Sequence, residues 1–177
     1  MTNIVHFEPL TPEKYPIYIA VGTKAYNQHY LHLWPGGNSS TYIQNSFTNE
    51  VLAKEALDTN TCLFIIHLKK LPVGILKFTL DKGLGPYSEE DALYVDKIYI
   101  LKEATGMGVG KKALQFISLR AKEINKKIMW LDTMQKGPAL NFYLKNGFER
   151  HAETKVPFEN AIEEEKPMYV MVKILSS

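Results

Sequence analysis

Three glycines stand close together past the middle of the chain, in the segment Thr105–Lys112, which reads TGMGVGKK. An apolar, β-branched stretch precedes them at residues 93–101, and an amphipathic stretch follows at residues 113–124. Glycine permits positive φ and a close approach of the backbone, so the N–H groups of such a loop can converge on an anion at the start of a helix. The pattern predicts a strand, a phosphate-binding loop and a helix, in that order.

Length and composition favour one folded domain that spans residues 1–177. Hydrophobic residues make up 45% of the chain and aromatic residues 11%, which is enough for a core of its own. A formal net charge of +2 is too small to predict a nucleic-acid or membrane partner. Cys62 is the only cysteine, so no disulfide forms within the chain. We expect no secretory signal and no membrane span, and therefore a soluble cytoplasmic protein.

Hydrophobic periodicity predicts an alternation of strands and helices. Strands are expected at residues 4–7, 63–68, 73–80, 93–101, 127–132, 148–156 and 168–175. Helices are expected from a cap at Thr11 to about residue 27 and over 42–58, 113–124 and 138–146, with Thr48 as an internal cap of the second. A tight turn at residues 69–72 joins two strands into an antiparallel hairpin, and one parallel crossover follows. The expected fold class is α/β (α+β) with one mixed sheet.

Two common phosphate-binding motifs fit the glycine loop less well than a third. A P-loop needs glycine where Thr105 stands and serine or threonine where Lys112 stands, so that interpretation fails twice. The dinucleotide fingerprint GxGxx(G/A) is formally complete over residues 108–113, with Asp132 at the end of the next strand. However, residues 102–105 separate the first strand from the loop, and only one further helix follows. Coenzyme A is the third interpretation.

Two separate motifs resemble the GCN5-related N-acetyltransferases (GNAT). The stretch from Ile98-Tyr99-Ile100 to Gly106-Met107-Gly108-Val109-Gly110-Lys111 is similar to the acetyl-CoA-binding segment of that family. Residues 139–148, ALNFYLKNGF, resemble its second signature, a short helix that runs into Gly-Phe. The order of elements from residue 4 to residue 175 also matches, so the resemblance covers nearly the whole chain.

The resemblance implies acetyl-CoA as co-substrate and a mostly antiparallel sheet that is splayed at the cofactor site, with helices on both faces. Pantetheine would bind the backbone of the long strand, and pyrophosphate would rest on the loop N–H groups, with Met107 and Val109 holding the loop against the core. The implied cofactor-binding residues are Ile98, Tyr99, Ile100, Gly106, Met107, Gly108, Val109, Gly110, Lys111, Lys136, Asn141 and Lys145. Thr105 replaces the Gln or Arg of the family pattern, and Lys136 replaces an asparagine.

Asp96 is a candidate catalytic base. It stands with Lys97 inside an otherwise apolar strand, which disfavours an acid unless it has a partner or a task. An acceptor amine of pKa about 10.4 must lose a proton before it attacks, at a cost of about 4–5 kcal/mol at pH 7. Asp96 could take that proton directly or through water. The alternative is an ion pair with Lys97 or with a cross-strand cation.

Tyr143 occupies the position where the family places a tyrosine that protonates the departing thiolate. A phenol of pKa near 10 can do this only with help from geometry. The alternative is an ordinary core aromatic. The resemblance also places a backbone N–H near Ile100 against the developing oxyanion.

The acceptor is predicted less directly than the donor. Acidic runs at residues 89–91 and 163–165 hint at a cationic amine, and several strand residues loosely resemble bacterial spermidine/spermine acetyltransferases. We therefore expect a small primary amine, with a polyamine favoured. Protein or peptide N-acetylation and a non-catalytic coenzyme A-binding module are the alternatives. No metal site is predicted from the five histidines, and a homodimer stays open.

Overall fold

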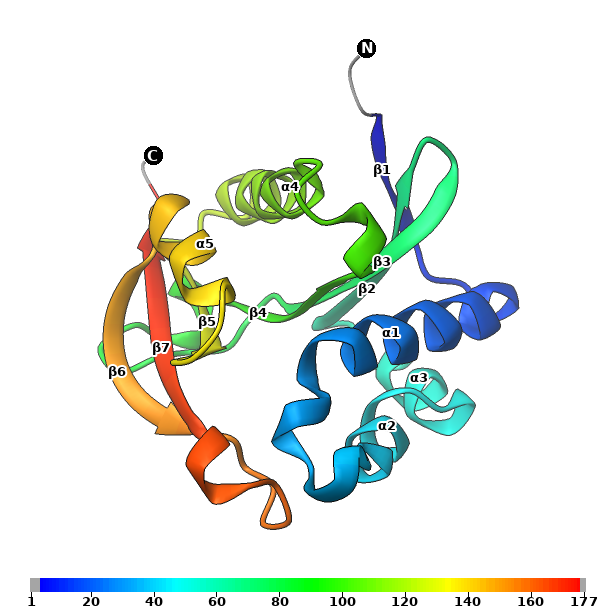
Figure 1. Ribbon diagram of the computed structural model, residues 1–177. Helices are drawn as coiled ribbons and strands as arrows, with labels where there is room; N and C mark the ends of the chain where they lie inside the picture. Colours follow the sequence, from blue (N-terminus) through cyan, green and yellow to red (C-terminus); the bar gives the residue numbers. More distant parts are fainter. Residues whose placement is uncertain (1–3, 176–177) are drawn as a thin grey trace.

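The structure is a computed structural model that describes residues 4–175 (Figure 1). Its seven strands are β1 (Val5–Pro9), β2 (Thr61–Leu68), β3 (Leu71–Thr79), β4 (Ala92–Ile100), β5 (Ile128–Met134), β6 (Glu149–Lys155) and β7 (Pro167–Ile174). Its α-helices are α1 (Tyr15–Tyr30), α2 (Ser40–Ser46), α3 (Asn49–Ala56), α4 (Val109–Glu123) and α5 (Ala139–Lys145). Short 3-10 helices lie at Pro12–Lys14, Leu31–Leu33, Pro35–Gly37, Glu89–Asp91, Lys102–Ala104 and Glu163–Glu165.

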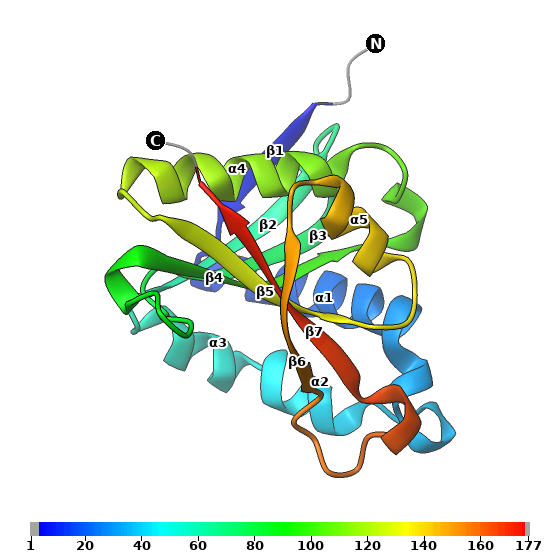
Figure 2. The same cartoon turned by 90° about the vertical axis from the view of Figure 1, so that its left-hand side faces the viewer.

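All seven strands form one sheet in the order β1-β2-β3-β4-β5-β7-β6. Neighbouring strands run antiparallel except β4 and β5, which run parallel. Helices α4 and α5 cover one face of the sheet, and α1, α2 and α3 cover the other (Figures 1 and 2). The predicted fold class, with helices on both faces of a mixed and mostly antiparallel sheet, is confirmed.

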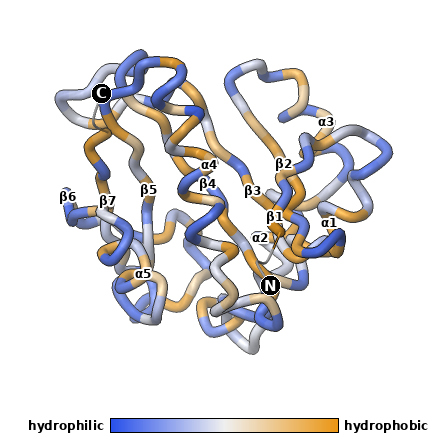
Figure 3. Tube along the Cα trace, turned by 90° about the horizontal axis from the view of Figure 1, so that it is seen from above, coloured by the Kyte–Doolittle hydropathy of each residue, from blue (hydrophilic) through white to orange (hydrophobic). Residues whose placement is uncertain are grey.

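Apolar residues of the strands supply a core to each face of the sheet. Figure 3 shows long apolar stretches along the strands. On one face, α4 packs its buried residues, among them Ala113 and Ile117, against Leu76 and Leu93. On the other face, the aromatic residues of α1 and the following segment, such as Tyr18 and Trp34, pack on β2 and β3. The two cores hold the sheet between rigid layers.

The parallel ladder between β4 and β5 is short. It joins only Ala92 to Ile128, Leu93 to Met129 and Tyr94 to Trp130. Beyond Tyr94 the two strands diverge, and the second half of β4 pairs with β3 alone. The sheet is therefore splayed beside the C-terminal half of β4, as predicted.

A β-bulge interrupts β4 at the start of the splayed half. Lys77 of β3 faces Lys97, but the next residue of β3, Phe78, faces Val95, so Asp96 is an extra residue without a cross-strand partner. The insertion changes which residues face each core. Val95 and Ile98, three positions apart, both contribute to the α4 side.

Two predicted helices differ from the observed ones. The helix expected over residues 42–58 is two helices, because Thr48 adopts an extended conformation and its side chain accepts a hydrogen bond from Val51 N–H at 3.1 Å. Thr48 is thus the N-cap of α3, and the prediction of one continuous helix over residues 42–58 was wrong. Helix α4 begins at Val109 instead of residue 113, so the glycine loop itself forms the helix start.

Candidate functional site

A cavity of about 410 Å³ opens beside the glycine loop, and we call it the loop cavity. Its walls are the C-terminal half of β4, the glycine loop, the start of α5 and the end of α1. Of the predicted cofactor-binding residues it is lined by Ile98, Tyr99, Ile100, Gly106, Gly108, Val109, Gly110 and Lys111. The remaining lining residues are His29, Tyr30, Ala104, Thr105, Pro138, Ala139, Phe142 and Tyr143.

Glycine is favoured at the three loop positions for two different structural reasons. Gly106 and Gly108 have φ of 76° and 81°, the left-handed region that L-residues rarely adopt. Gly110 has an ordinary φ, but a Cβ there would lie 2.9 Å from Cζ of Phe142. Val109 is buried and anchors the loop in the core, as predicted. Met107 is 39% exposed, so the prediction that it packs against the core was wrong.

The backbone of β4 presents groups to the loop cavity that do not pair with β3. Leu101 N–H donates to Val73 O at 2.7 Å, and hydrogen-bonded residues alternate along an antiparallel pair. The N–H and C=O groups of Ile98 and Ile100 therefore point away from β3, toward the gap left by β5. The carbonyl of Ile100 accepts a hydrogen bond from His29 Nε2 at 2.9 Å, a contact that had no signal in the sequence.

Four predicted cofactor-binding residues do not line the loop cavity: Met107, Lys136, Asn141 and Lys145. Lys136 forms an ion pair with Glu165 at 3.3 Å, and the other three side chains are exposed. Thr105 does line the cavity, but its hydroxyl donates to the carbonyl of Lys102 at 2.7 Å.

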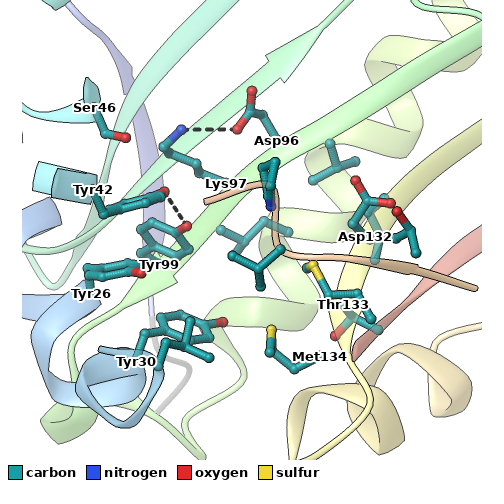
Figure 4. A pocket seen from close by; sticks show the side chains of 18 of the residues that line it. Tyr26, Tyr30, Tyr42, Ser46, Asp96, Lys97, Tyr99, Asp132, Thr133 and Met134 are labelled. Atoms are coloured by element: carbon teal, nitrogen blue, oxygen red, sulfur yellow. Dashed lines mark hydrogen bonds and ion pairs between the residues drawn. The ribbon is translucent and has the colours of Figure 1, made fainter. Parts of the chain in front are cut away.

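A second cavity, of about 480 Å³, lies across the splayed strands, and we call it the tyrosine cavity. Its lining includes acidic, basic and apolar residues and six tyrosines: Tyr26, Tyr30, Tyr42, Tyr94, Tyr99 and Tyr143. Figure 4 shows side chains that converge on it from α1, α2, β4 and β5. The hydroxyls of Tyr42 and Tyr99 lie 2.5 Å apart, and the rings of Tyr26 and Tyr42 stack with centroids 3.8 Å apart. The tyrosine rings thus form a rigid, mostly apolar wall.

Asp96 lines the tyrosine cavity and is held by two lysines. Its Oδ1 lies 3.0 Å from Lys97 Nζ, and its Oδ2 lies 3.3 Å from the cross-strand Lys77 Nζ. Lys77 also pairs with Glu55 at 3.1 Å. Burial alone would raise the pKa of Asp96. The positive charges of Lys97 and Lys77 lower that pKa by more than burial raises it, so the pKa of Asp96 lies below its usual value. Both ion pairs that the sequence left as alternatives are therefore present.

Asp132 of β5 also lines the tyrosine cavity, and its surroundings differ from those of Asp96. The hydroxyl of Tyr94 donates to its Oδ2 at 3.1 Å. Within residues 4–175, no basic side chain forms an ion pair with Asp132. Burial raises the pKa of Asp132 above its usual value, and the charge of Asp96 adds to this, against the Tyr94 hydrogen bond and the charge of Lys82.

The two cavities meet at residues that line both of them, namely Tyr30, Ile98, Tyr99 and Tyr143. Tyr143 belongs to α5 and packs edge-on against Phe142 and Phe148. Burial raises the pKa of Tyr143, and the neighbouring Tyr30 raises it further, so its phenol stays protonated at neutral pH. The two cavities therefore adjoin at these four side chains.

The acidic runs of the two loops do not line the tyrosine cavity, and some of their residues pair with lysines. Asp91 pairs with Lys127 at 3.0 Å, and Glu163 pairs with Lys166 at 2.8 Å. The hint of a cationic ligand therefore does not come from these runs. Of the two aspartates inside the cavity, Asp96 is already paired with lysines, whereas Asp132 has no ion pair within residues 4–175.

Comparison with known proteins identifies the family. The model of the acetyltransferase (GNAT) domain matches residues 59–150, more than half of the chain. The chain belongs to this family. The matched GNAT region runs from before β2 to the start of β6, so it includes β4, the glycine loop and α5. The predicted family is confirmed.

Individual relatives are distant in sequence and close in fold. An uncharacterized N-acetyltransferase of Lactobacillus delbrueckii subsp. lactis, from the pepI 3′ region, is 22% identical over 113 residues, or 63% of this chain and 65% of that protein. The chain thus spans slightly less than two thirds of that curated relative. The crystal structure of the PaiA N-acetyltransferase of Thermoplasma acidophilum in complex with coenzyme A superposes with a TM-score of 0.76 at 15% identity, over 97% of this chain and 99% of that one.

A GNAT acetyltransferase of Streptococcus pneumoniae has a TM-score of 0.71 at 16% identity, over 98% of this chain and 100% of that one. At these identities the structural likenesses establish the GNAT fold. Across residues 4–175, the structure contains no helix long and apolar enough to cross a membrane. The same residues contain no group of three or more His, Cys, Asp or Glu side chains suited to a metal ion.

Proposed function

We propose that the chain transfers the acetyl group of acetyl-CoA to a primary amine by direct attack in a ternary complex. The observation that supports this most is the junction of the two cavities at Tyr30, Ile98, Tyr99 and Tyr143. A thioester reaching the junction from the loop cavity would meet an amine reaching it from the tyrosine cavity. Direct transfer requires both reactants to be held together in this way.

Coenzyme A fits the loop cavity on the chemistry of its walls. The start of α4 and the left-handed glycines Gly106 and Gly108 offer N–H groups to a pyrophosphate. The backbone groups of Ile98 and Ile100 that point into the gap can pair with the amides of pantetheine, as another strand would. The PaiA N-acetyltransferase, similar in fold, was solved with coenzyme A bound.

Tyr143 is the proposed acid. It lies at the junction, and its geometry there has to offset the raised pKa, which makes the phenol a weaker acid toward a thiolate. When the amine nitrogen attacks the thioester carbonyl, the C–S bond breaks and the sulfur gains the electron pair. Tyr143 would donate its proton to that sulfur and recover one from solvent. A free N–H of Ile98 or Ile100 would stabilise the oxyanion.

Asp96 is proposed to assist removal of the amine proton through water. Its lysine partners keep the carboxylate ionised at neutral pH, and a carboxylate of low pKa is a weak base. Its contribution is therefore to accept a hydrogen bond from the water that carries the amine proton to solvent.

The proposed acceptor is a small molecule of the polyamine kind, a choice that also fits the loose resemblance to spermidine/spermine acetyltransferases. A cavity of about 480 Å³ is of the size that takes a small ligand. Asp132 and the tyrosine rings of this cavity suit an alkylammonium group, since carboxylates and aromatic faces both attract cations. A peptide amine is the second candidate acceptor.

A screen for thiol release tests the proposal. Wild-type protein is incubated with acetyl-CoA and, in parallel, with polyamines, monoamines, aminoglycosides and peptides, while coenzyme A binding is measured by calorimetry. We expect release that depends on both acetyl-CoA and a polyamine. Turnover with peptides alone would favour the protein acetyltransferase. Coenzyme A binding without turnover of any amine would contradict catalysis and favour a binding module.

A further inference from the structure

The two carboxylates of the tyrosine cavity are in opposite electrostatic states. Asp96 has Lys97 and Lys77 within 3.3 Å, and its pKa is lowered. Asp132 accepts a hydrogen bond from the Tyr94 hydroxyl, and residues 4–175 supply no cation in ion-pair contact with it. A partly buried carboxylate without a cation is unfavourable, because burial removes water that the charge would otherwise bind.

We propose that Asp132 binds a second, non-reacting ammonium group of the acceptor and thereby selects diamines and longer polyamines over monoamines. The inference rests on the proposed function, since it assigns one end of the acceptor to a named residue. The reacting amine must be neutral when it attacks, so it cannot be the group that a carboxylate holds as a cation. A ligand that satisfies Asp132 at the same time must carry another amine.

The surroundings of Asp132 support a ligand ammonium instead of a protein one. The charge of Lys82 acts on Asp132, but its Nζ lies over the ring of Tyr94, 3.9 Å from the centroid, and forms no ion pair with the carboxylate. Lys97 is engaged by Asp96, and Lys155 is an exposed residue of the edge strand β6. A ligand ammonium can therefore form with Asp132 the ion pair that no residue of 4–175 forms.

The path between Asp132 and the junction suits an alkyl chain. Leu131 and Met134 of β5, Val95 and Ile98 of β4 and the tyrosine rings line the same cavity. Methylene groups pack favourably on such surfaces, because their burial removes apolar area from water. This arrangement favours an acceptor with an ammonium at each end and an apolar chain between them.

The test compares α,ω-diamines of three to eight carbons with n-alkylamines of the same lengths, by acetyl-CoA-dependent thiol release. We expect wild-type kcat/KM to be at least tenfold higher for the best diamine than for the matched monoamine. Asp132→Asn keeps the size of the side chain and removes the charge, so the diamine preference should fall at least tenfold, mainly through KM. Tyr94→Phe, which removes the hydrogen-bond donor to Asp132, should reduce the preference in the same direction by a smaller factor.

Glu164→Gln is the matched control, because it removes one negative charge from an exposed loop residue outside the cavity. Its diamine preference should equal that of wild type. If Asp132→Asn and Glu164→Gln lower the preference equally, or if wild type shows no preference while amines are turned over, the role of Asp132 is overturned and the acetyltransferase proposal stands. If no amine is turned over while coenzyme A binds, both are overturned. The preference is a ratio within one preparation, so partial unfolding of a variant does not change it.

Discussion

The hydroxyl of Tyr94 donates to Asp132 Oδ2 at 3.1 Å, and it does so at the point where β4 and β5 separate. Tyr94 is the last residue of β4 that pairs with β5, and Asp132 lies two residues beyond its partner Trp130. The hydrogen bond thus continues the contact between the two strands by side chains after the backbone ladder has ended. It also holds the carboxylate at the wall of the tyrosine cavity.

Asp132→Asn should stabilise the folded protein at neutral pH. Because the folded-state pKa of Asp132 is higher than the unfolded one, ionisation of this group disfavours folding once the pH is above the folded pKa, and the effect is absent below the unfolded pKa. The neutral amide removes the effect and still accepts the Tyr94 hydrogen bond. We expect a gain of about 0.5 kcal/mol in unfolding free energy at pH 7, measured with urea. A decrease in unfolding free energy at pH 7 would show that the ionised carboxylate of Asp132 stabilises the fold.

Asp96→Asn should instead destabilise the folded protein at neutral pH. The folded-state pKa of Asp96 is lowered, so its ion pairs stabilise the protein above the unfolded pKa near 4, and this contribution is lost as the pH falls through the folded pKa. Removing the charge leaves the buried Lys97 without its partner. We expect a loss of about 1–3 kcal/mol at pH 7 and a flatter decline of stability below about pH 4 than in wild type. Parallel pH curves for the two proteins would contradict this account.

Tyr143→Phe should lower kcat by about 100-fold or more, because the hydroxyl that protonates the thiolate is removed. The affinity for coenzyme A should change by less than about threefold, since the ring remains in the wall of the loop cavity. Stopped-flow thiol release and calorimetry measure the two quantities. Tyr30→Phe, at the same junction but without a proposed proton transfer, is the control and should retain most of the activity. Equal losses in both variants would argue against an acid at Tyr143.

Gly110→Ala should disturb the contact between α4 and α5. A Cβ at this position lies 2.9 Å from Phe142 Cζ, so the ring must move, at a cost of about 1–3 kcal/mol. Coenzyme A should bind more weakly because Phe142 also lines the loop cavity. In urea unfolding, Gly110→Ala combined with Phe142→Leu should cost less than the sum of the two single variants. Strict additivity would mean that the two positions do not touch.

Local signals in the sequence were sufficient for most of the fold. The glycine loop, the hairpin and the cap at Thr48 each depend on residues that are near one another in the chain, and all three are present. The split between α2 and α3 was missed because apolar residues continue with helical spacing through Phe47. There the extended backbone of Thr48 overrides the periodicity.

The site could be predicted only where one segment supplies it. Ile98, Gly108 and their neighbours line the loop cavity as expected, because strand and loop are adjacent in sequence. The tyrosine cavity is assembled from α1, α2, β4, β5 and the segment after β6, which no local pattern brings together. Likewise, Lys136 was predicted to bind the cofactor, but its partner, Glu165, comes from a distant loop.

The bulge at Asp96 also had no local signal. An extra residue in β4 is defined by the register of β3, where Lys77 faces Lys97 and Phe78 faces Val95. A regular strand would place Asp96 and Lys97 on opposite faces, whereas here both line the tyrosine cavity. The sequence offered the ion pair between Asp96 and Lys97 as one alternative. It did not indicate that this pair would line a cavity.

The short ladder between β4 and β5 means that the molecule is already open before any ligand arrives. Admitting a strand-like ligand into a continuous sheet would first require backbone hydrogen bonds to break, and that penalty would weaken binding. Here the strands diverge after Tyr94 as a result of folding, so the N–H groups of Ile98 and Ile100 do not have to leave a neighbouring strand before a ligand binds. The site is preorganised, and less of the free energy of a new backbone pairing is lost to opening the sheet.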